Sequence, residues 1–259
     1  MTELVHYALD RAIATVTLDS PANRNALSAQ LVGELAAHLT AAGADDAVRA
    51  VVLTHTGSVF CAGADLREQV SEGGPQEGTR RVVALMRQIV ELPKPVIVRV
   101  DGAVRAGGIG LVGASDIAVA SRKASFALTE VRLGLAAAMI SLTLRTRMPE
   151  RAAARYLLTG DVFDADAAVA AGILTAAADD LDSEITALCD SLRLCSPQGL
   201  REGKRVLTSG VLREFDERAE QMQQLSASLF ASDEAREGML AFLEKRPPRR
   251  GSPGRRPRV

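Results

Sequence analysis

The chain has 259 residues, 47% of them hydrophobic and 24% charged, which is the composition of a globular protein that can bury a sizeable core. Its formal net charge of -1 excludes a general electrostatic attraction to nucleic acid or to an anionic membrane. The three cysteines form no C-x-x-C pair, which argues against a disulfide framework and a structural zinc site. No basic segment leads into an apolar stretch near the start, and no run approaches the ~18 apolar residues of a membrane span. We therefore expect a cytoplasmic protein with no membrane or nucleic-acid partner.

The first half of the chain alternates extended and helical patterns. Apolar and polar residues alternate over residues 11–18, which predicts a strand. Leucines recur every four residues at positions 31, 35 and 39, as on an amphipathic helix, and Ser28 is a candidate cap for that helix. Residues 51–53 and 96–100 are short β-branched runs bounded by turn residues. Strands separated by helices predict an α/β fold around a largely buried parallel sheet.

The second half reads almost entirely as helices from Pro149 onward. Its one strand candidate lies near residues 173–176. The predicted helices cover residues 150–158, 165–171, 183–194, 197–207 and 213–230. The last of these carries enough apolar side chains to dock against the core or a neighbouring subunit, so an oligomer is expected.

The chain ends in a basic tail. Residues 245–259 hold seven Lys or Arg and four Pro with hardly an apolar side chain, which predicts disorder. We expect a core over residues 1–195, a helical region over 196–246 and a disordered tail over 247–259. Nucleic-acid binding through this tail is an alternative, but a short charged tail is usually only solvated.

Two glycine-bearing loops follow predicted strands, at residues 60–66 (FCAGADL) and 102–110 (GAVRAGGIG). Ligands bind beyond the carboxyl ends of strands in open α/β sheets, and small residues there let a substrate approach backbone N–H groups. Two such loops side by side could form an oxyanion hole. The alternative is that the glycines only permit tight turns. The spacing of a dinucleotide-binding loop and that of a P-loop are both absent.

Several short blocks resemble the crotonase (enoyl-CoA hydratase/isomerase) family and occur in the family's order. They are residues 60–66, 94–97 (KPVI), Gly107-Gly108 followed by 115–117 (SDI), Phe126 with Glu130, 158–160 (LTG), 170–173 (AAGI) and 241–248 (AFLEKRPP). The resemblance spans nearly the whole chain. It implies an α/β fold with a crotonase-like ββα spiral core and a C-terminal helical region, assembled as a homotrimer or a dimer of trimers.

The resemblance also implies a site for an acyl-CoA thioester, with coenzyme A as part of the substrate and no separate cofactor or metal. Backbone N–H groups of Ala64 and Gly107 would hold the thioester oxygen, and Glu130 would exchange a proton with the substrate or activate water. The substrate-binding residues would be Arg24, Ala26, Ala62, Asp65, Leu66, Gly108, Phe242 and Lys245. Phe242 and Lys245, from the C-terminal helix of one subunit, would complete the coenzyme A site, with Lys245 facing a phosphate of coenzyme A.

The residues themselves leave other readings open for several of these positions. Glu130 could be a surface glutamate before a turn, or be paired with Arg132; burial among apolar neighbours would instead raise its pKa toward the working pH. Asp65 could cap a helix, and Arg24 and Lys245 could be solvated surface residues. Separated histidines and serines outside a G-x-S-x-G elbow do not indicate a metal site or a serine hydrolase.

One departure from the family bears on the reaction. Hydratases of the family usually carry a second glutamate where this chain has Gly110. Hydration is conveniently shared between two carboxylates, whereas moving a double bond needs one proton shuttle. An enoyl-CoA hydratase with a single glutamate is the principal expectation, and residues 129–141 resemble hydratases of methylglutaconyl-type substrates. The alternatives are a Δ3-Δ2-enoyl-CoA isomerase and a catalytically weak acyl-CoA-binding protein. Arg105 is a further candidate for orienting substrate or water.

Overall fold

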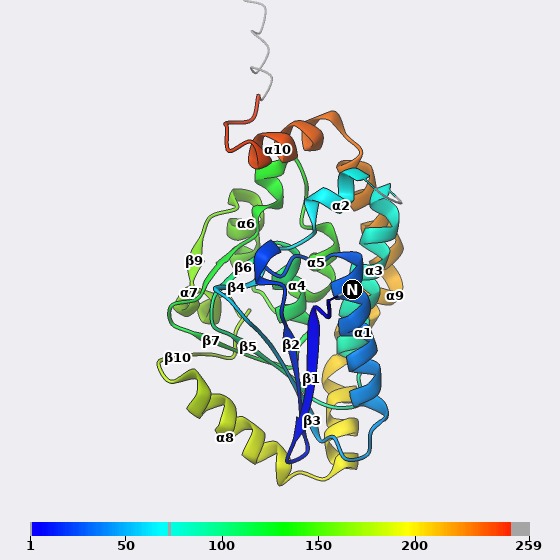
Figure 1. Ribbon diagram of the computed structural model, residues 1–259, viewed down its shortest axis with the longest axis vertical. Coiled ribbons are helices and arrows are strands. Elements are labelled where there is room, and N and C mark those ends of the chain that lie inside the picture. Colours follow the sequence, from blue (N-terminus) through cyan, green and yellow to red (C-terminus); the bar gives the residue numbers. More distant parts are fainter. Residues whose placement is uncertain (1, 72–73, 250–259) are drawn as a thin grey trace, which may run out of the picture.

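The computed structural model describes residues 2–71 and 74–249, and over these the chain forms two β-sheets flanked by helices (Figure 1). The larger sheet has the strand order β1-β2-β3-β5-β7-β10, antiparallel between β1 and β2 and parallel elsewhere. These strands are β1 (Val5–Asp10), β2 (Ile13–Leu18), β3 (Ala50–His55), β5 (Val96–Val100), β7 (Ile117–Ser121) and β10 (Ala176–Ala178). The predicted α/β class and its parallel sheet are confirmed.

The smaller sheet has the order β4-β6-β8-β9, with β4 (Val59–Cys61), β6 (Ala103–Arg105) and β8 (Ser125–Ala127) parallel and β9 (Phe163–Asp164) antiparallel to β8. Each of β4, β6 and β8 directly follows a strand of the larger sheet and precedes helical chain. This is the expected ββα repeat. The two glycine-bearing loops therefore leave β4 and β6, and not the longer strands as the sequence suggested.

The helices after the short strands complete the three repeats. After β4 come α2 (Leu66–Ser71) and α3 (Gly74–Glu91), after β6 comes α4 (Gly107–Ala114), and after β8 come the 3-10 helix η2 (Thr129–Leu133) and α5 (Ala138–Leu144). Because β4, β6 and β8 are neighbours in one parallel sheet, the chain that leaves each of them emerges at the same edge. The fold thus brings together three segments that lie far apart in the sequence.

The central strands β3, β5 and β7 of the larger sheet are buried on both faces, which explains their continuous apolar runs. Val51 and Leu53 of β3 belong to the main core together with Leu35 of α1 (Ala29–Ala44). The intervening Val52 faces the other way and packs with Ile185 of α8 (Leu181–Arg193). In Figure 1, α8 crosses the lower end of the molecule, while α1, α3 and α9 (Pro197–Phe230) stand together along one side.

Local signals set several element boundaries. The Oγ of Ser28 accepts a hydrogen bond from the N–H of Leu31 at 3.2 Å, so the predicted cap of α1 is confirmed. Strand β2 begins at Ile13, two residues later than predicted, because Arg11 and Ala12 adopt positive φ and turn the β1–β2 hairpin. The strand expected at residues 173–176 is β10, which starts at Ala176.

The C-terminal part is helical, as predicted, with α6 (Glu150–Thr159), α7 (Ala165–Ala170), α8, α9 (Pro197–Phe230) and α10 (Asp233–Leu243). The expected pair of helices over 197–207 and 213–230 is wrong, because α9 runs through both. The stretch between the two expected helices contains Gly210, but a helix interior accepts one glycine at a cost of about 1 kcal/mol when packing supports the helix.

A buried ion pair anchors the first half of α9. The Nζ of Lys204 lies 2.8 Å from Oδ2 of Asp116 and also donates to the carbonyl of Ile89, and the lysine is only 5% exposed. Asp116 also accepts from the N–H of Val96 at 2.7 Å, so one carboxylate joins α9 to the start of β5 and β7.

The chain beyond α10 is only partly described. The N–H of Arg249 donates to Glu237 at 2.7 Å, and of the predicted tail over 247–259, residues 250–259 lie outside the described residues. None of the helices that the structure describes is long and apolar enough to cross a membrane.

Candidate active site

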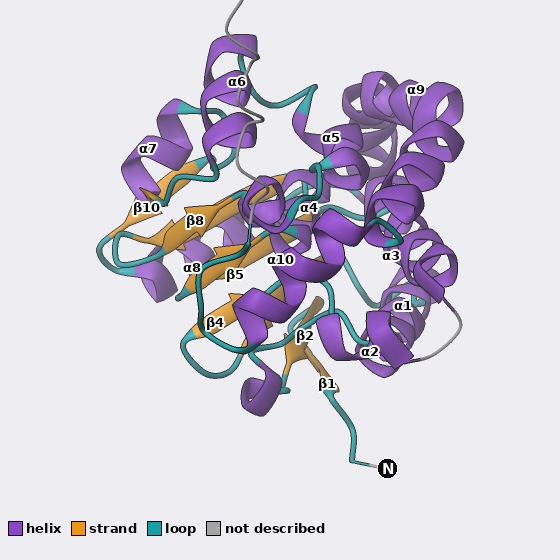
Figure 2. Cartoon of the chain, turned by 90° about the horizontal axis from the view of Figure 1, so that it is seen from above, coloured by secondary structure: helices purple, strands orange, loops and turns teal. Residues whose placement is uncertain are grey.

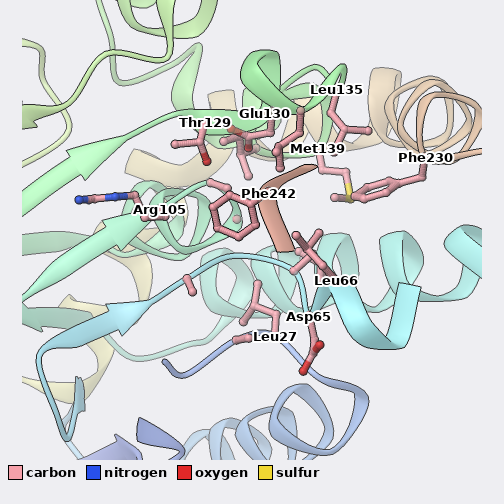
Figure 3. A pocket seen from close by; sticks show the side chains of 18 of the residues that line it. Leu27, Asp65, Leu66, Arg105, Thr129, Glu130, Leu135, Met139, Phe230 and Phe242 are labelled. Carbon is pink, nitrogen blue, oxygen red and sulfur yellow. The ribbon is translucent and has the colours of Figure 1, made fainter. Parts of the chain in front are cut away.

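A cavity of about 690 Å³ opens at the edge where the three repeats end (Figure 3). Its walls come from residues 22–27, from the loops after β4 and β6, from η2 and the start of α5, and from the ends of α9 and α10. Figure 2 looks down on α10, which lies across this end of the molecule. The volume and the mostly apolar walls suit a small-molecule site.

The loops after β4 and β6 touch each other on the cavity wall. A Cβ atom added to Gly107 would lie 3.6 Å from Gly63 Cα and 3.8 Å from the backbone N of Ala64. Gly107 is the first residue of α4, where a helix leaves its N–H groups without intrahelical acceptors. Both Ala64 and Gly107 line the cavity. Two backbone N–H groups so close together could serve a single oxygen atom.

The backbone at this contact adopts unusual conformations. Gly63 has a φ of +90°, and a side chain there would approach Ala106 Cβ to 2.8 Å. Ala106, directly before Gly107, has φ 47° and ψ −122°, and its N–H donates to the carbonyl of Ala127 at 3.0 Å. Strained backbone at residues other than glycine is found mostly at functional sites, where the surrounding structure enforces the conformation.

The segment 24–27 runs beside the loop after β4 and fixes its course. Ala62 N–H donates to the carbonyl of Arg24 at 3.1 Å, and Leu27 N–H donates to the carbonyl of Gly63 at 2.8 Å. Asn25 holds this segment in place: fully buried, its amide donates to the carbonyls of Thr56 and Val59 and accepts from the N–H of Ser20. These three hydrogen bonds of the buried amide tie the segment 24–27 to the backbone of Ser20, Thr56 and Val59.

Glu130 lies on η2 with its carboxyl group at the cavity (Figure 3). Its Oε2 is buried and has no hydrogen-bond partner among the described residues. Burial, which disfavours the charged form, raises the pKa of Glu130 from 4.5 to about 7. Arg132, the alternative partner, binds Asp161 at 3.1 Å and the carbonyl of Thr159 at 3.3 Å. Glu130 is therefore not a surface glutamate but a buried carboxyl group that can give or take a proton near neutral pH.

The position of Gly110 is closed to any larger side chain. A Cβ atom there would stand 2.6 Å from Ile140 Cγ2 and 2.7 Å from Met86 Sδ. Gly110 is itself buried in α4, and Ile140, from α5, forms part of the cavity wall. Hydrocarbon and sulfur thus occupy the place where related hydratases would carry a second glutamate.

Most of the predicted substrate-binding residues line the cavity. They are Arg24, Ala26, Ala62, Asp65, Leu66 and Phe242. The carboxylate of Asp65 points away from Glu130 (Figure 3) and accepts from the N–H of Arg67 at 2.9 Å, which is the local turn role that the sequence left open.

Two further candidates lie outside the cavity wall, whereas a third, Arg105, lines the cavity. Gly108 packs against the strand behind it, where a Cβ would meet Cys61 Cβ at 2.8 Å, so it serves the close approach of α4 and is not part of the cavity wall. Lys245 is exposed just beyond α10 and does not line the cavity. The guanidinium of Arg105 points outward (Figure 3) and donates to the carbonyl of Ser125 at 2.6 Å and to its Oγ at 2.9 Å.

Sequence reasoning missed the apolar wall of the cavity, which includes Leu27, Leu135, Met139 and Phe230. In Figure 3 the sulfur of Met139 lies beside the ring of Phe230, at the side of the cavity away from Arg105. They come from the segment before α1, the turn after η2, α5 and the end of α9, and nothing local distinguishes them from core residues. Within the described ranges no three His, Cys, Asp or Glu side chains gather as they would around a metal ion.

The chain is similar to known proteins over nearly its whole length. The family model described as Enoyl-CoA hydratase/isomerase matches residues 9–252. A crystal structure of an enoyl-CoA hydratase from Mycobacterium avium is 54% identical, covers 96% of this chain and 99% of its own, and superposes with a TM-score of 0.89. A provisionally named enoyl-CoA hydratase of Thermus thermophilus is 36% identical over 92% of this chain and 96% of its own. The 1,2-epoxyphenylacetyl-CoA isomerase of Escherichia coli is 31% identical over 96% of this chain and 98% of its own.

Proposed function

The chain belongs to the enoyl-CoA hydratase/isomerase family, and on that premise we propose that it hydrates a 2-enoyl thioester of coenzyme A with Glu130 as its single acid/base. The observation that carries the proposal is the buried, unpartnered carboxyl oxygen of Glu130 at the cavity. A general acid/base works best with a pKa near the operating pH, and the pKa of Glu130 is raised to about 7.

The reaction would use the two backbone donors and the one carboxylate together. Ionised Glu130 takes a proton from water as the water oxygen bonds to the β-carbon of the enoyl group. The electron pair of the double bond moves toward the thioester, whose oxygen becomes negative and is held by the N–H groups of Ala64 and Gly107. Protonated Glu130 then returns its proton to the α-carbon. Removing one donor from such a hole typically costs about 10²- to 10³-fold in turnover.

The coenzyme A part would follow the wall formed by residues 24–27 and 62–66. Arg24 and Arg67 both line the cavity and are suited to phosphate. Phe242 would contact the nucleotide or the pantetheine, with Lys245 near a phosphate. The substrate brings its own coenzyme A, so no further cofactor is proposed.

We also propose that the chain acts in the cytoplasm as a homotrimer or a dimer of trimers. Exposed apolar side chains on α9 support an oligomer, since Val206 and Leu207 are 71% and 81% exposed.

A second candidate is a Δ3-Δ2-enoyl-CoA isomerase, and Gly110 is the observation that favours it. With Ile140 and Met86 in the place of a second carboxylate, water has one fewer anchor, whereas double-bond migration needs only one group that removes a proton and returns it two carbons away. A catalytically weak acyl-CoA-binding protein is the third possibility, which Glu130 argues against.

One experiment separates these candidates. Purified protein and its Glu130→Gln variant are incubated with crotonyl-CoA, with a 3-enoyl-CoA and with 3-methylglutaconyl-CoA, and the products are followed by mass and by chromatography that separates double-bond isomers. A gain of one water from a 2-enoyl ester identifies the hydratase, and an unchanged mass with a shifted double bond identifies the isomerase. Binding of all three esters without any product would reject both enzymes.

A further inference from the structure

The backbone of α10 lies in direct contact with the backbone of the segment that carries Glu130. A Cβ atom added to Gly238 would lie 2.4 Å from the carbonyl oxygen of Leu133 and 2.7 Å from its carbon. On the facing side, a Cβ on Gly134 would lie 3.0 Å from Glu234 C and 3.1 Å from Ala235 N. Glycine on both surfaces lets the two chains approach more closely than side chains would allow.

A small apolar cluster holds this contact together. Leu135, Ala235 and Met239 are buried against one another, and Leu229 and Phe230 from the end of α9 pack around them. The contact leads directly to Glu130, because its carbonyl accepts from the N–H of Gly134 and from that of Leu135, the latter at 3.0 Å. A shift of α10 would therefore displace the turn that sets the position of the carboxyl group.

The same helix reaches the ligand cavity one turn later. Phe242 stands four residues after Gly238, which puts both on one face of α10, and its ring enters the cavity wall in front of Glu130 (Figure 3). Phe242 is 49% exposed and Lys245 is exposed beyond it, so the end of α10 can meet a ligand that extends out of the cavity.

We propose that α10 couples the nucleotide end of the substrate to Glu130, with Gly238 as the positioning residue. The inference rests on the proposed function. Coenzyme A that docks on Phe242 and Lys245 presses α10 onto residues 133–135 and holds the carboxyl group against the reacting carbons. Enzymes commonly use the binding energy of remote substrate parts in this way, so that truncated substrates lose turnover and not only affinity.

The test compares a 2-enoyl-CoA with the 2-enoyl thioester of pantetheine, which lacks the nucleotide. The wild type should show a higher kcat with the coenzyme A ester. In Gly238→Ala the methyl group forces α10 away from Leu133, and kcat with the coenzyme A ester should fall about 100-fold, as expected for a displacement of about 1 Å. The ratio of the two kcat values should then approach one. Gly210→Ala is the matched control, because the same substitution in α9 meets open space.

Two further readouts distinguish positioning from simple damage. Looser packing admits water and lowers the pKa of Glu130, so the acid limb of the pH profile should move to lower pH in Gly238→Ala. The other charged groups of the cavity are the same in both proteins; they are Arg24, Asp65, Arg67, Arg105 and Arg132. Met239→Ala serves if Gly238→Ala does not fold, because it weakens the cluster without a clash. In Met239→Ala the ratio of kcat with the coenzyme A ester to kcat with the pantetheine ester should also fall toward one.

A measurement that needs no turnover separates this inference from the proposed function. Coenzyme A alone should slow hydrogen exchange of the amides at 129–135 in the wild type and in Gly210→Ala but not in Gly238→Ala. If the wild type converts no enoyl thioester yet shows this protection, the proposed function fails and the coupling stands. Equal kcat values for both wild-type substrates, or unchanged exchange at 129–135 on binding, would overturn the coupling.

Discussion

Gly110 and Ile140 face each other so closely that a single added carbon on Gly110 would stand 2.6 Å from Ile140 Cγ2. The absence of a second carboxylate is therefore built into the packing between α4 and α5, and one substitution cannot reverse it. We expect Gly110→Glu to lose about 1–3 kcal/mol of unfolding free energy from overpacking, with more lost if the carboxylate is charged. We expect its hydratase activity to be no higher than that of the wild type.

Urea unfolding followed by circular dichroism measures that loss. Gly33→Glu is the control, because Gly33 is exposed on α1 and a side chain there meets nothing within 4 Å. The double variant Gly110→Glu with Met86→Ala should regain part of the stability. An unfolding midpoint for Gly110→Glu equal to that of the wild type would contradict the packing argument.

Glu130→Gln should abolish most turnover and preserve binding of the coenzyme A ester. Loss of a general acid/base typically costs about 10²- to 10⁴-fold in rate. In the wild type, kcat/KM should rise with pH through about 7, because the ionised carboxylate is the form that takes the first proton. Steady-state rates from pH 5 to 9 and titration calorimetry with the ester test both statements. A profile that stays flat through neutrality would rule out Glu130 as the base.

The same carboxyl group should make stability fall as the pH rises. Its folded pKa of about 7 lies above the ordinary 4.5, so the folded state binds the proton more tightly, and that contribution is complete below 4.5 and lost as the pH rises through 7. The loss is about 3 kcal/mol. Glu130→Gln lacks this dependence. The difference in unfolding free energy between the variant and the wild type should therefore be about 3 kcal/mol more in favour of the variant at pH 8 than at pH 4. Urea titrations at both values give the comparison.

Gly107→Val should lower turnover about 10²- to 10³-fold by obstructing the oxyanion hole. Its Cβ would stand 3.1 Å from Leu27 Cδ1, a flexible contact, so the fold should survive, but the new side chain lies beside the backbone N of Ala64. Gly203→Val on α9 meets open space and provides the control. Turnover of Gly107→Val equal to that of the control would reject the assignment of these two N–H groups.

Phe230→Ala should shift preference toward longer acyl chains, because the ring closes the cavity beside Met139 (Figure 3). One methylene in an apolar pocket is worth about 10- to 200-fold in specificity. We expect the ratio of kcat/KM for a ten-carbon over a four-carbon 2-enoyl ester to rise at least about 10-fold. Leu229→Ala is the matched control, since Leu229 packs on the same cluster as Phe230 but does not line the cavity. Equal ratios in both variants would place the acyl chain elsewhere.

The sequence predicted features that depend on residues close together in the chain, and it did not predict contacts between residues far apart. The buried parallel sheet and the cap at Ser28 follow from local periodicity and hydrogen bonding, which act over a few residues. The short strands β4, β6 and β8 have three residues each, too few for a period to be recognised. The break expected between residues 207 and 213 is absent, because a glycine such as Gly210, which weakens an isolated helix, is tolerated when the helix is packed along its length.

The site itself was predicted by resemblance and only in part by chemistry. Glu130 in an apolar stretch suggested a raised pKa, and the structure supplies that burial. Gly108 could not be told from Gly107 in sequence, because only the three-dimensional course of α4 turns one to the cavity and the other toward Cys61. The wall at Met139 and Phe230 depends on contacts between segments about ninety residues apart, which no local pattern encodes.

The contact between α10 and the turn that carries Glu130 also has a consequence for synthesis of the chain. Gly238 contacts Leu133 across more than a hundred residues, and such long-range contacts form late because much chain must be ordered first. Synthesis proceeds from the N-terminus, so Leu133 leaves the ribosome well before Gly238 does. A nascent chain with both sheets already formed would therefore still lack an ordered turn at Glu130 until α10 emerged, and we expect a product truncated before α10 to form its sheets without ordering that turn.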